Sequence, residues 1–188
     1  MEHTRDTYLE KLLIGYRSSY DVESATHETL PLAARADFHM RETQYALFKS
    51  AEMSASHSDE YVYFYSIPHL TRDMVGACIQ YTYDDGMAKI DLEGKDAHMC
   101  TRLVAVFLCD SADQAAVEEI EKCRIYKSFQ FSLKGWMEFH TAAIDFGKES
   151  VVSNRYGRET AKFLKSVLHP PKRRRKANPL SILKKMLD

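Results

Sequence analysis

The stretch TRLVAVFLCD, residues 101–110, constrains the fold more than any other part of the chain. It is the most apolar run in the sequence, and it is short. A short and continuous apolar run is typical of a strand that is covered on both faces, whereas a half-exposed strand alternates apolar and polar side chains. Residues 101–110 therefore predict a central strand.

Several other segments alternate apolar and polar side chains with the two-residue period of a half-buried strand. We expect such strands at residues 32–41, 124–133 and 136–144, and further strands at residues 43–53, 60–67 and 151–153. A polar stretch at 54–59 predicts a loop, and Gly135 marks the turn of a hairpin. The front third of the chain is therefore predicted to form a helix and then a three-stranded meander.

Apolar side chains at helical spacing predict helices between these strands. One falls in residues 4–22, ending near Gly15, and another in residues 70–83. The segment from Ser111 to Gln114 matches a capping box that opens a helix through about Cys123. A later helix stops at Pro170. Residues 84–99 are too polar and too marked by glycine to predict a long element.

Hairpins dominate this order of elements, which predicts an α+β fold. We expect a mostly antiparallel sheet of about six to seven strands with helices largely on one face, plus a C-terminal amphipathic helix. A chain of 188 residues is long enough for one well-buried core and short for two. We therefore expect a single α+β domain over residues 1–168, followed by a basic linker and a short helix at 169–188.

Charge is distributed unevenly along the chain. The last twenty residues carry seven lysine and arginine side chains against Asp188, a net charge of +6, which leaves residues 1–168 at −7. The cations gather after two prolines, at Lys172, Arg173, Arg174, Arg175 and Lys176. Such a run predicts salt-sensitive binding to nucleic acid or another polyanion, because each phosphate contact releases a counterion. The acidic body is the competing partner for the same tail.

The end of the tail has an apolar stripe of its own. Residues 179–188 place leucine, isoleucine and methionine side chains on one side of a short predicted helix, beside Lys184 and Lys185. A basic amphipathic helix suits a groove on a partner protein, a membrane surface, or the body of the same chain. The sequence leaves these three alternatives open.

The polar face of the first predicted strand is a second candidate binding site. It carries Arg35, Asp37, His39 and Arg41. Alternating charges are what an exposed sheet face needs for solubility, but two arginines could also grip an anion in bidentate fashion. Glu138 and His140 could join them if their strands were neighbours.

A nuclease is the catalytic alternative. Asp84 or Asp85, followed by Glu93 and Lys95, resembles the acidic-and-lysine pattern of the restriction-endonuclease-like superfamily. In that pattern, two carboxylates hold a divalent metal and the lysine assists at the scissile phosphate. The resemblance implies a cleft in which these side chains converge on adjacent strands.

Other chemistry has little support in the sequence. The chain contains no glycine-rich phosphate-binding motif, no serine nucleophile motif and no helical pair of histidines, so we expect no cofactor and no metal. A metal site assembled from distant strands, such as His39, His98 and His140, is the alternative.

The cysteines and the apolar segments indicate the compartment. Neither zinc-like nor paired spacing occurs among the cysteines, which lie beside apolar residues and are expected to be free thiols rather than a disulfide: Cys78, Cys100, Cys109 and Cys123. The N-terminus does not resemble a signal peptide, and no segment is apolar enough to span a bilayer. We expect a soluble cytoplasmic protein without a transmembrane segment.

Three short elements carry a resemblance to known proteins. They are His98-Met99, Gly135-Trp136 and the V-x-N-x-x-G-x-E pattern from Val152 to Glu159. In these elements the chain resembles a family of small uncharacterised bacterial and archaeal proteins. The resemblance implies no activity. We therefore expect a non-catalytic binding or interaction protein of unknown function, with a metal-dependent nuclease-like enzyme as the alternative.

Overall fold

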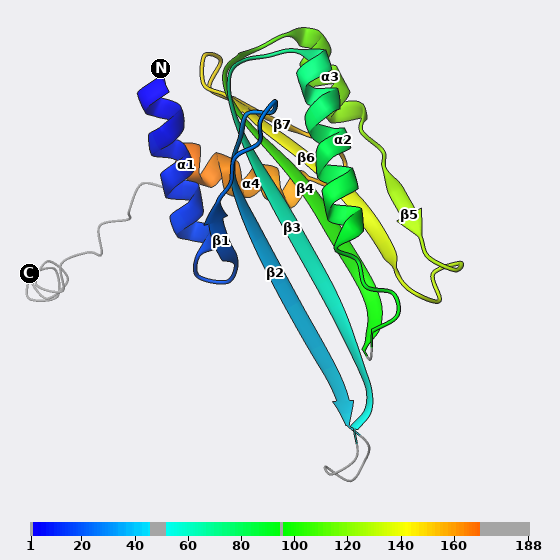
Figure 1. Cartoon of the computed structure of the whole chain (residues 1–188). Helices are drawn as coiled ribbons and strands as arrows, with labels where there is room; N and C mark the ends of the chain where they lie inside the picture. Colours follow the sequence, from blue (N-terminus) through cyan, green and yellow to red (C-terminus); the bar gives the residue numbers. More distant parts are fainter. Residues whose placement is uncertain (1, 46–51, 95, 170–188) are drawn as a thin grey trace, which may run out of the picture.

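The computed structural model describes residues 2–45, 52–94 and 96–169, which form four helices and seven strands (Figure 1). The elements follow one another as α1 (Glu2–Tyr16), β1 (Asp21–Ser24), β2 (Leu32–Tyr45), β3 (Glu52–Leu70), α2 (Arg72–Ala88), β4 (Ala97–Ala112), α3 (Gln114–Lys122), β5 (Tyr126–Ser128), β6 (Trp136–Asp145), β7 (Ser150–Ser153) and α4 (Arg158–Leu168). The predicted tail at 170–188 lies outside the described residues.

All seven strands belong to one sheet, in the order β1-β2-β3-β4-β6-β5, with β7 also paired to β6. Four of the strand pairs are antiparallel, whereas β3 with β4 and β4 with β6 are parallel. The predicted α+β fold with a mostly antiparallel sheet is confirmed. The predicted central strand is also confirmed, because β4 lies in the middle of the sheet and its residues 103–109 are all buried.

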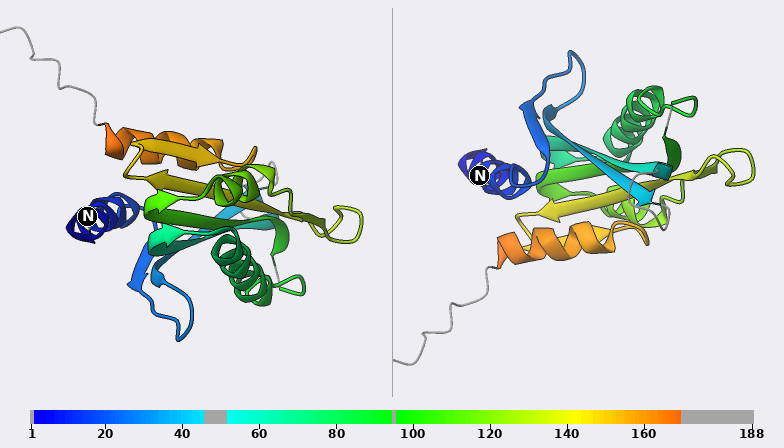
Figure 2. Two further views of the ribbon diagram at one scale, coloured as in Figure 1. Left: turned by 90° about the horizontal axis from the view of Figure 1, so that it is seen from above. Right: turned by 90° about the horizontal axis from the view of Figure 1, so that it is seen from below.

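Helices cover both faces of the sheet, so the prediction that they lie largely on one face is wrong. Helices α2 and α3 pack on the face that carries Leu103 and Phe107, and α1 and α4 pack on the face that carries Val104 and Leu108. Figure 2 shows α2 across the sheet from α1 and α4. The reason lies in β4 itself, since its odd and even residues are both apolar and each face must therefore be covered.

Two elements are longer than expected. Residues 54–59 belong to β3 rather than to a loop, because backbone pairing with β2 and β4 does not depend on how polar the side chains are. Helix α2 continues through Asp84, Asp85 and Gly86 to Ala88. Gly86 serves close packing here, since a Cβ on it would lie 2.4 Å from Leu103 Cδ2.

Two other elements begin or end differently from the prediction. The cap of α3 is Asp113, without a side-chain hydrogen bond, so Ser111 does not form the predicted capping box and instead lies at the end of β4. The predicted hairpin around Gly135 is present, but its first strand β5 is only three residues long. The backbone after it turns through positive φ at Gln130, Phe131 and Ser132, which ends the strand.

The Asn154 side chain hydrogen bonds to the outer edge of β6, between the segments that pair with β5 and β7. Its Oδ1 accepts the backbone N–H groups of Thr141 and Gly157, at 3.1 and 2.7 Å, and its Nδ2 donates to the carbonyl groups of Phe139 and Cys123. The side chain is buried and uses both of its polar atoms. Gly157 fits because a Cβ there would lie 2.4 Å from the Thr141 carbonyl oxygen. Together they fix the turn into α4.

Candidate functional site

The predicted anion-binding face on β2 is occupied by internal ion pairs. Each polar residue contacts a side chain outside β2: Arg35 pairs with Asp85 at 3.5 Å, Asp37 with Lys89 at 3.0 Å and Arg41 with Asp96 at 2.6 Å, and His39 Nδ1 lies 2.8 Å from Asp59 Oδ1. The four side chains therefore serve four different contacts, and the structure does not bring the two arginines together around a common point.

Tyrosines surround the inner part of this cluster. The Tyr63 hydroxyl donates to Asp85 Oδ2 at 2.6 Å, and Arg35 lies over the Tyr63 ring and is hydrogen bonded to the Tyr81 hydroxyl. Lys89 lies 4.7 Å from the centre of the Tyr61 ring. We call Arg35, Asp37, Asp85, Lys89 and Tyr63 the α2-face cluster. Its ion pairs link α2 to the sheet, and two of its buried atoms, Arg35 Nε and Asp37 Oδ1, have no hydrogen-bond partner among the described residues.

The residues of the nuclease pattern do not share a cleft. Asp84 and Asp85 lie on α2 rather than on a strand, where Asp84 accepts from Gln80 and Asp85 from Tyr63. Glu93 lies in the following loop, 86% exposed and paired with Lys134. Lys95 lies outside the described residues. Within the described part of the chain, no group of histidine, cysteine, aspartate and glutamate side chains is arranged to hold a metal ion.

Glu138 and His140 do not join the β2 residues. Direct pairing places Arg35 opposite Tyr63 and therefore on the α2 face, whereas His140 lines a pocket on the opposite face, beneath α4. Strands β3 and β4 also separate β2 from β6. The binding residues that were proposed in the tail, from Lys172 to Lys176, lie outside the described residues.

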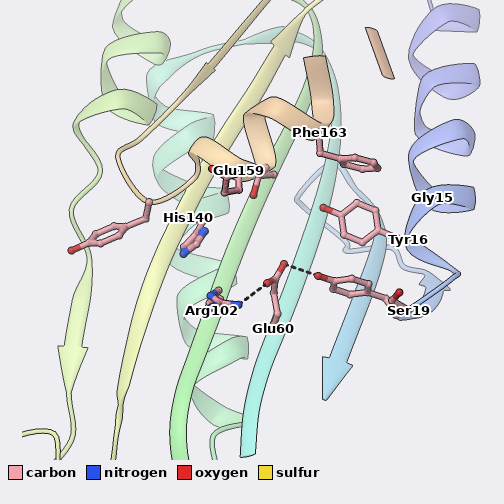
Figure 3. A pocket seen from close by; sticks show the side chains of 11 residues that line it. Gly15, Tyr16, Ser19, Glu60, Arg102, His140, Glu159 and Phe163 are labelled. Carbon is pink, nitrogen blue, oxygen red and sulfur yellow. Dashed lines mark hydrogen bonds and ion pairs between the residues drawn. The ribbon is translucent and has the colours of Figure 1, made fainter. Parts of the chain in front are cut away.

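A pocket of about 490 Å³ opens on that opposite face, between the end of α1, the start of α4 and the sheet (Figure 3). We call it the α1–α4 pocket. Its lining combines aromatic, charged and hydroxyl side chains with one glycine: Gly15, Tyr16, Ser19, Tyr20, Glu60, Arg102, His140, Tyr156, Glu159, Thr160 and Phe163. None of the residues proposed from the sequence as a binding or catalytic set, other than His140, lies in it.

Strand register produces the charged row on the sheet side of the pocket. Glu60 pairs with Arg102 across β3 and β4, and Arg102 pairs with Glu138 across β4 and β6. Glu60 and Arg102 lie on the same face as Val62 and Val104 and precede them by two residues in their strands. Val62 and Val104 belong to the buried apolar core. The row therefore begins where the apolar face of the sheet ends.

Glu60 lies between two donors in this pocket. Tyr20 donates its hydroxyl to Glu60 Oε1 at 3.0 Å, and an Arg102 guanidinium nitrogen lies 3.6 Å from Glu60 Oε2 (Figure 3). The Arg102 side chain is half exposed, whereas that of Glu60 is only 17% exposed. Burial and the nearby Glu60 carboxylate both raise the pKa of Tyr20, which keeps its hydroxyl protonated as a donor.

His140 supplies a neutral group on the β6 side of the pocket. Its Nε2 lies 3.4 Å from Glu138 Oε2, and its ring stacks on Tyr156 with the ring centres 6.1 Å apart. Burial lowers the pKa of His140, and this effect outweighs the opposing influence of the Glu138 carboxylate. The imidazole is therefore uncharged at neutral pH, and it can donate or accept a hydrogen bond.

Tyr16 is the most buried polar side chain in the pocket. It is 8% exposed, and its ring packs edge-on against Phe64, Phe163 and Tyr20. Its hydroxyl points into the pocket in Figure 3 and has no hydrogen-bond partner among the described residues. Burial is the main cause that raises the pKa of Tyr16, so the hydroxyl stays protonated. The hydroxyl faces the pocket, so water or a ligand there can satisfy it.

No local pattern in the sequence indicated most of this site. Glu60 and Arg102 are charged residues at strand positions, which is ordinary for a half-exposed sheet, and only the pairing of their strands brings them together. Trp136, Glu138 and His140 lie on one face of β6, as the alternation predicted for residues 136–144 requires, and Trp136 Nε1 donates to Glu138 beside His140. That alternation was the one signal that led toward the pocket.

The three elements that carried the family resemblance have structural roles beside the site. Gly135 adopts a φ of 75°, and a Cβ on it would lie 2.2 Å from the Met99 carbonyl oxygen. Buried His98 holds the same turn, since its Nδ1 lies 2.8 Å from the Lys134 carbonyl oxygen. Asn154 and Gly157 shape the turn that places Tyr156 and Glu159 at the pocket.

Comparisons with known proteins give a family but no activity. A family model described as a domain of unknown function, DUF8052, matches residues 4–166. No curated protein and no solved structure matches the chain. Separately, none of the helices in the described ranges has the length and apolar character needed to cross a membrane. The match spans most of the chain, and the chain therefore belongs to this family of unknown function.

Proposed function

We propose that this protein is a non-catalytic binding protein that holds a small organic molecule in the α1–α4 pocket. A volume of about 490 Å³ is within the range of sites for small ligands. The mixture of aromatic walls with a few polar groups is also typical of such sites. The anion-binding role of the basic tail stays a prediction from the sequence.

The observation that carries this proposal is the Tyr16 hydroxyl, which points into the pocket from a buried ring and has no hydrogen-bond partner among the described residues. The ring alone makes the packing contacts with Phe64, Phe163 and Tyr20, so the hydroxyl is left to hydrogen bond with water or a ligand in the pocket. The nearby Glu60 and Arg102 add charges that the apolar core does not need. A ligand with polar groups can hydrogen bond with Tyr16 and pair with Glu60 and Arg102.

Thermal shift measurements with a panel of small molecules test the proposal. The panel covers amino acids, amines, carboxylic acids, sugars and nucleotides. We expect at least one class to raise the melting temperature of the wild-type protein, because a ligand that binds only the folded state stabilises it. A panel without any stabilising compound would contradict the proposal.

A matched pair of variants locates the binding site. Ser19 lines the pocket and Ser18 is its exposed neighbour outside the lining, so Ser19→Trp fills the entrance while Ser18→Trp does not. Thr160→Trp blocks the pocket from α4, so the test does not depend on Ser19→Trp alone if that variant fails to fold. We expect both blocking variants to lose the ligand-induced shift and Ser18→Trp to keep it. Equal shifts in all variants would place the ligand elsewhere.

A further inference from the structure

The geometry of the α1–α4 pocket points to a class of ligand, and we propose that it is a free α-amino acid with an apolar side chain, bound as a zwitterion. This inference rests on the proposed binding function and adds the chemistry of the molecule. Three features carry it: two opposite charges side by side, a balanced pocket charge, and an aromatic wall.

Glu60 and Arg102 present opposite charges at neighbouring positions. They are direct partners in the register of β3 and β4, whose backbones lie about 4.8 Å apart in a sheet. An α-amino acid carries its ammonium and carboxylate groups on the same carbon atom, so its two charges also lie side by side. When the ligand is oriented so that each of its charges meets the opposite charge of the pocket, its ammonium group contacts Glu60 and its carboxylate contacts Arg102.

The pair is open enough to accept such a molecule. The nitrogen and oxygen atoms of Arg102 and Glu60 are 3.6 Å apart, whereas a charge-assisted hydrogen bond is about 2.7–2.9 Å long. Arg102 is half exposed and has five N–H donors, and this one long ion pair leaves donors available. Glu60 Oε2 likewise has lone pairs beyond its contact with Arg102. The Tyr16 hydroxyl adds a donor.

The net charge of the inner pocket favours a neutral ligand with two charged groups. Within the lining, Glu60 and Arg102 balance each other, and burial lowers the pKa of His140. Glu138, beside Arg102 in the register but outside the lining, contacts Trp136 and His140. Glu159 lies at the rim, 82% exposed and paired with Lys162. A lone carboxylate at Arg102 would face Glu60, and a lone amine at Glu60 would face Arg102. A ligand with both groups can pair with both residues at once.

Aromatic rings provide a place for an apolar side chain. Tyr16 packs edge-on against Tyr20 at 4.8 Å and against Phe163 at 5.4 Å between ring centres, and all three line the pocket. Gly15 lines the same wall without a side chain. An aliphatic or aromatic group that contacts these rings would leave water, which favours binding in proportion to the apolar area removed.

Calorimetric titration with three matched compounds tests the ligand class. The compounds are L-phenylalanine, phenylalaninamide, which lacks the carboxylate, and 3-phenylpropionate, which lacks the amine. We expect L-phenylalanine to bind about tenfold or more tightly than either analogue, because each analogue leaves one charged residue of the pocket unpaired. Equal or tighter binding of an analogue would overturn the inference, as would no binding of L-phenylalanine.

Two variants assign the contacts. Glu60→Gln is expected to weaken binding of L-phenylalanine and phenylalaninamide, and Arg102→Gln is expected to weaken binding of L-phenylalanine and 3-phenylpropionate. Arg72→Gln removes an exposed arginine that pairs with Glu119 outside the pocket, and it is expected to leave all three affinities unchanged. Equal affinity of wild type and both pocket variants for L-phenylalanine would overturn the inference.

The two proposals fail in distinguishable ways. If another compound of the thermal shift panel binds and Ser19→Trp blocks it, the pocket is a binding site and only the amino-acid inference is wrong. If no panel compound is sensitive to the blocking variants, the binding function itself is wrong.

Discussion

The two faces of the sheet carry similar polar side chains and use them differently. In the α2-face cluster, Arg35 and Lys89 meet Asp85 and Asp37 beneath a helix, and Tyr63 donates its hydroxyl to the same group of charges. In the α1–α4 pocket, one arginine and one glutamate form a longer ion pair that faces an open volume. Both clusters contain tyrosines beside charges, but only in the pocket does a tyrosine hydroxyl face an open volume without a partner among the described residues.

The difference shows what turns a polar cluster into a candidate site. A helix that lies over paired charges needs them matched, because a buried charge without a partner is strongly destabilising. Where α1 and α4 leave a pocket, a charge can remain incompletely paired and available to a ligand. We therefore expect substitutions in the α2-face cluster to change stability, and substitutions in the pocket to change binding.

The largest expected effect is in the α2-face cluster. Asp85→Asn removes the negative charge that Arg35 and the Tyr63 hydroxyl share, and should lower the free energy of unfolding by about 2 kcal/mol. Asp84→Asn is the matched control, because Asp84 is the exposed neighbour on α2 and accepts only from Gln80 among the described residues. Urea unfolding of both variants measures the difference. Equal losses of unfolding free energy in the two variants would contradict the structural role assigned to the α2-face cluster.

A smaller effect should follow pH through His140. Burial lowers its pKa in the folded protein, so below the unfolded value of about 6.5 the unfolded chain binds more protons. Stability that depends on this group is therefore complete above about pH 6.5 and falls as the pH drops toward the folded pKa. His140→Gln should lose less free energy of unfolding between about pH 7.5 and about pH 5.5 than the wild type. A variant as acid-sensitive as the wild type would contradict this assignment.

Glu60→Gln should have little effect on stability. The substitution keeps an acceptor for the Tyr20 hydroxyl and removes a charge whose only ion pair among the described residues is 3.6 Å long. We expect a change in the free energy of unfolding of about 0.5 kcal/mol or less. Urea unfolding beside Asp85→Asn gives the comparison directly. A loss as large as that of Asp85→Asn would show that the pocket charges are structural.

The smallest effect on stability is expected from removing residues 172–188. Both faces of the sheet are covered by helices within the described residues, so the truncated chain should unfold at the same urea concentration as the full chain. The deletion should abolish binding to mixed DNA and RNA at low salt, since the tail carries the clustered cations. A much less stable truncated protein would make the tail part of the fold.

Periodicity predicted the strand faces well but not the order of the strands. The alternation that placed Trp136, Glu138 and His140 on one face depends only on the two-residue period, and it is confirmed. The parallel pairing of β4 with β3 and β6 leaves no such trace in the sequence. For the same reason the helices could not be assigned to both faces, although β4 is apolar on both.

The site was harder to predict than the fold. Glu60 and Arg102 are distant in the chain, and each alone is what a soluble sheet needs. Arg35 and Asp85 drew attention because they stand in locally charged segments, yet their contacts neutralise them. Which charged side chains become neighbours depends on which distant strands pair. That pairing cannot be read from a single sequence.

The hydrogen bonds of Asn154 also affect how accessible the outer edge of β6 is to a strand from another molecule. An unpaired strand edge invites a strand from another molecule, and proteins commonly protect such edges. At the outer edge of β6, β5 pairs with residues 136–138 and β7 with residues 142–145, and the Asn154 side chain bonds the backbone of Phe139 and Thr141 between them. The Asn154 side chain thereby occupies backbone groups of β6 that neither β5 nor β7 reaches. Because these groups are already hydrogen bonded, a strand from another molecule cannot pair with them.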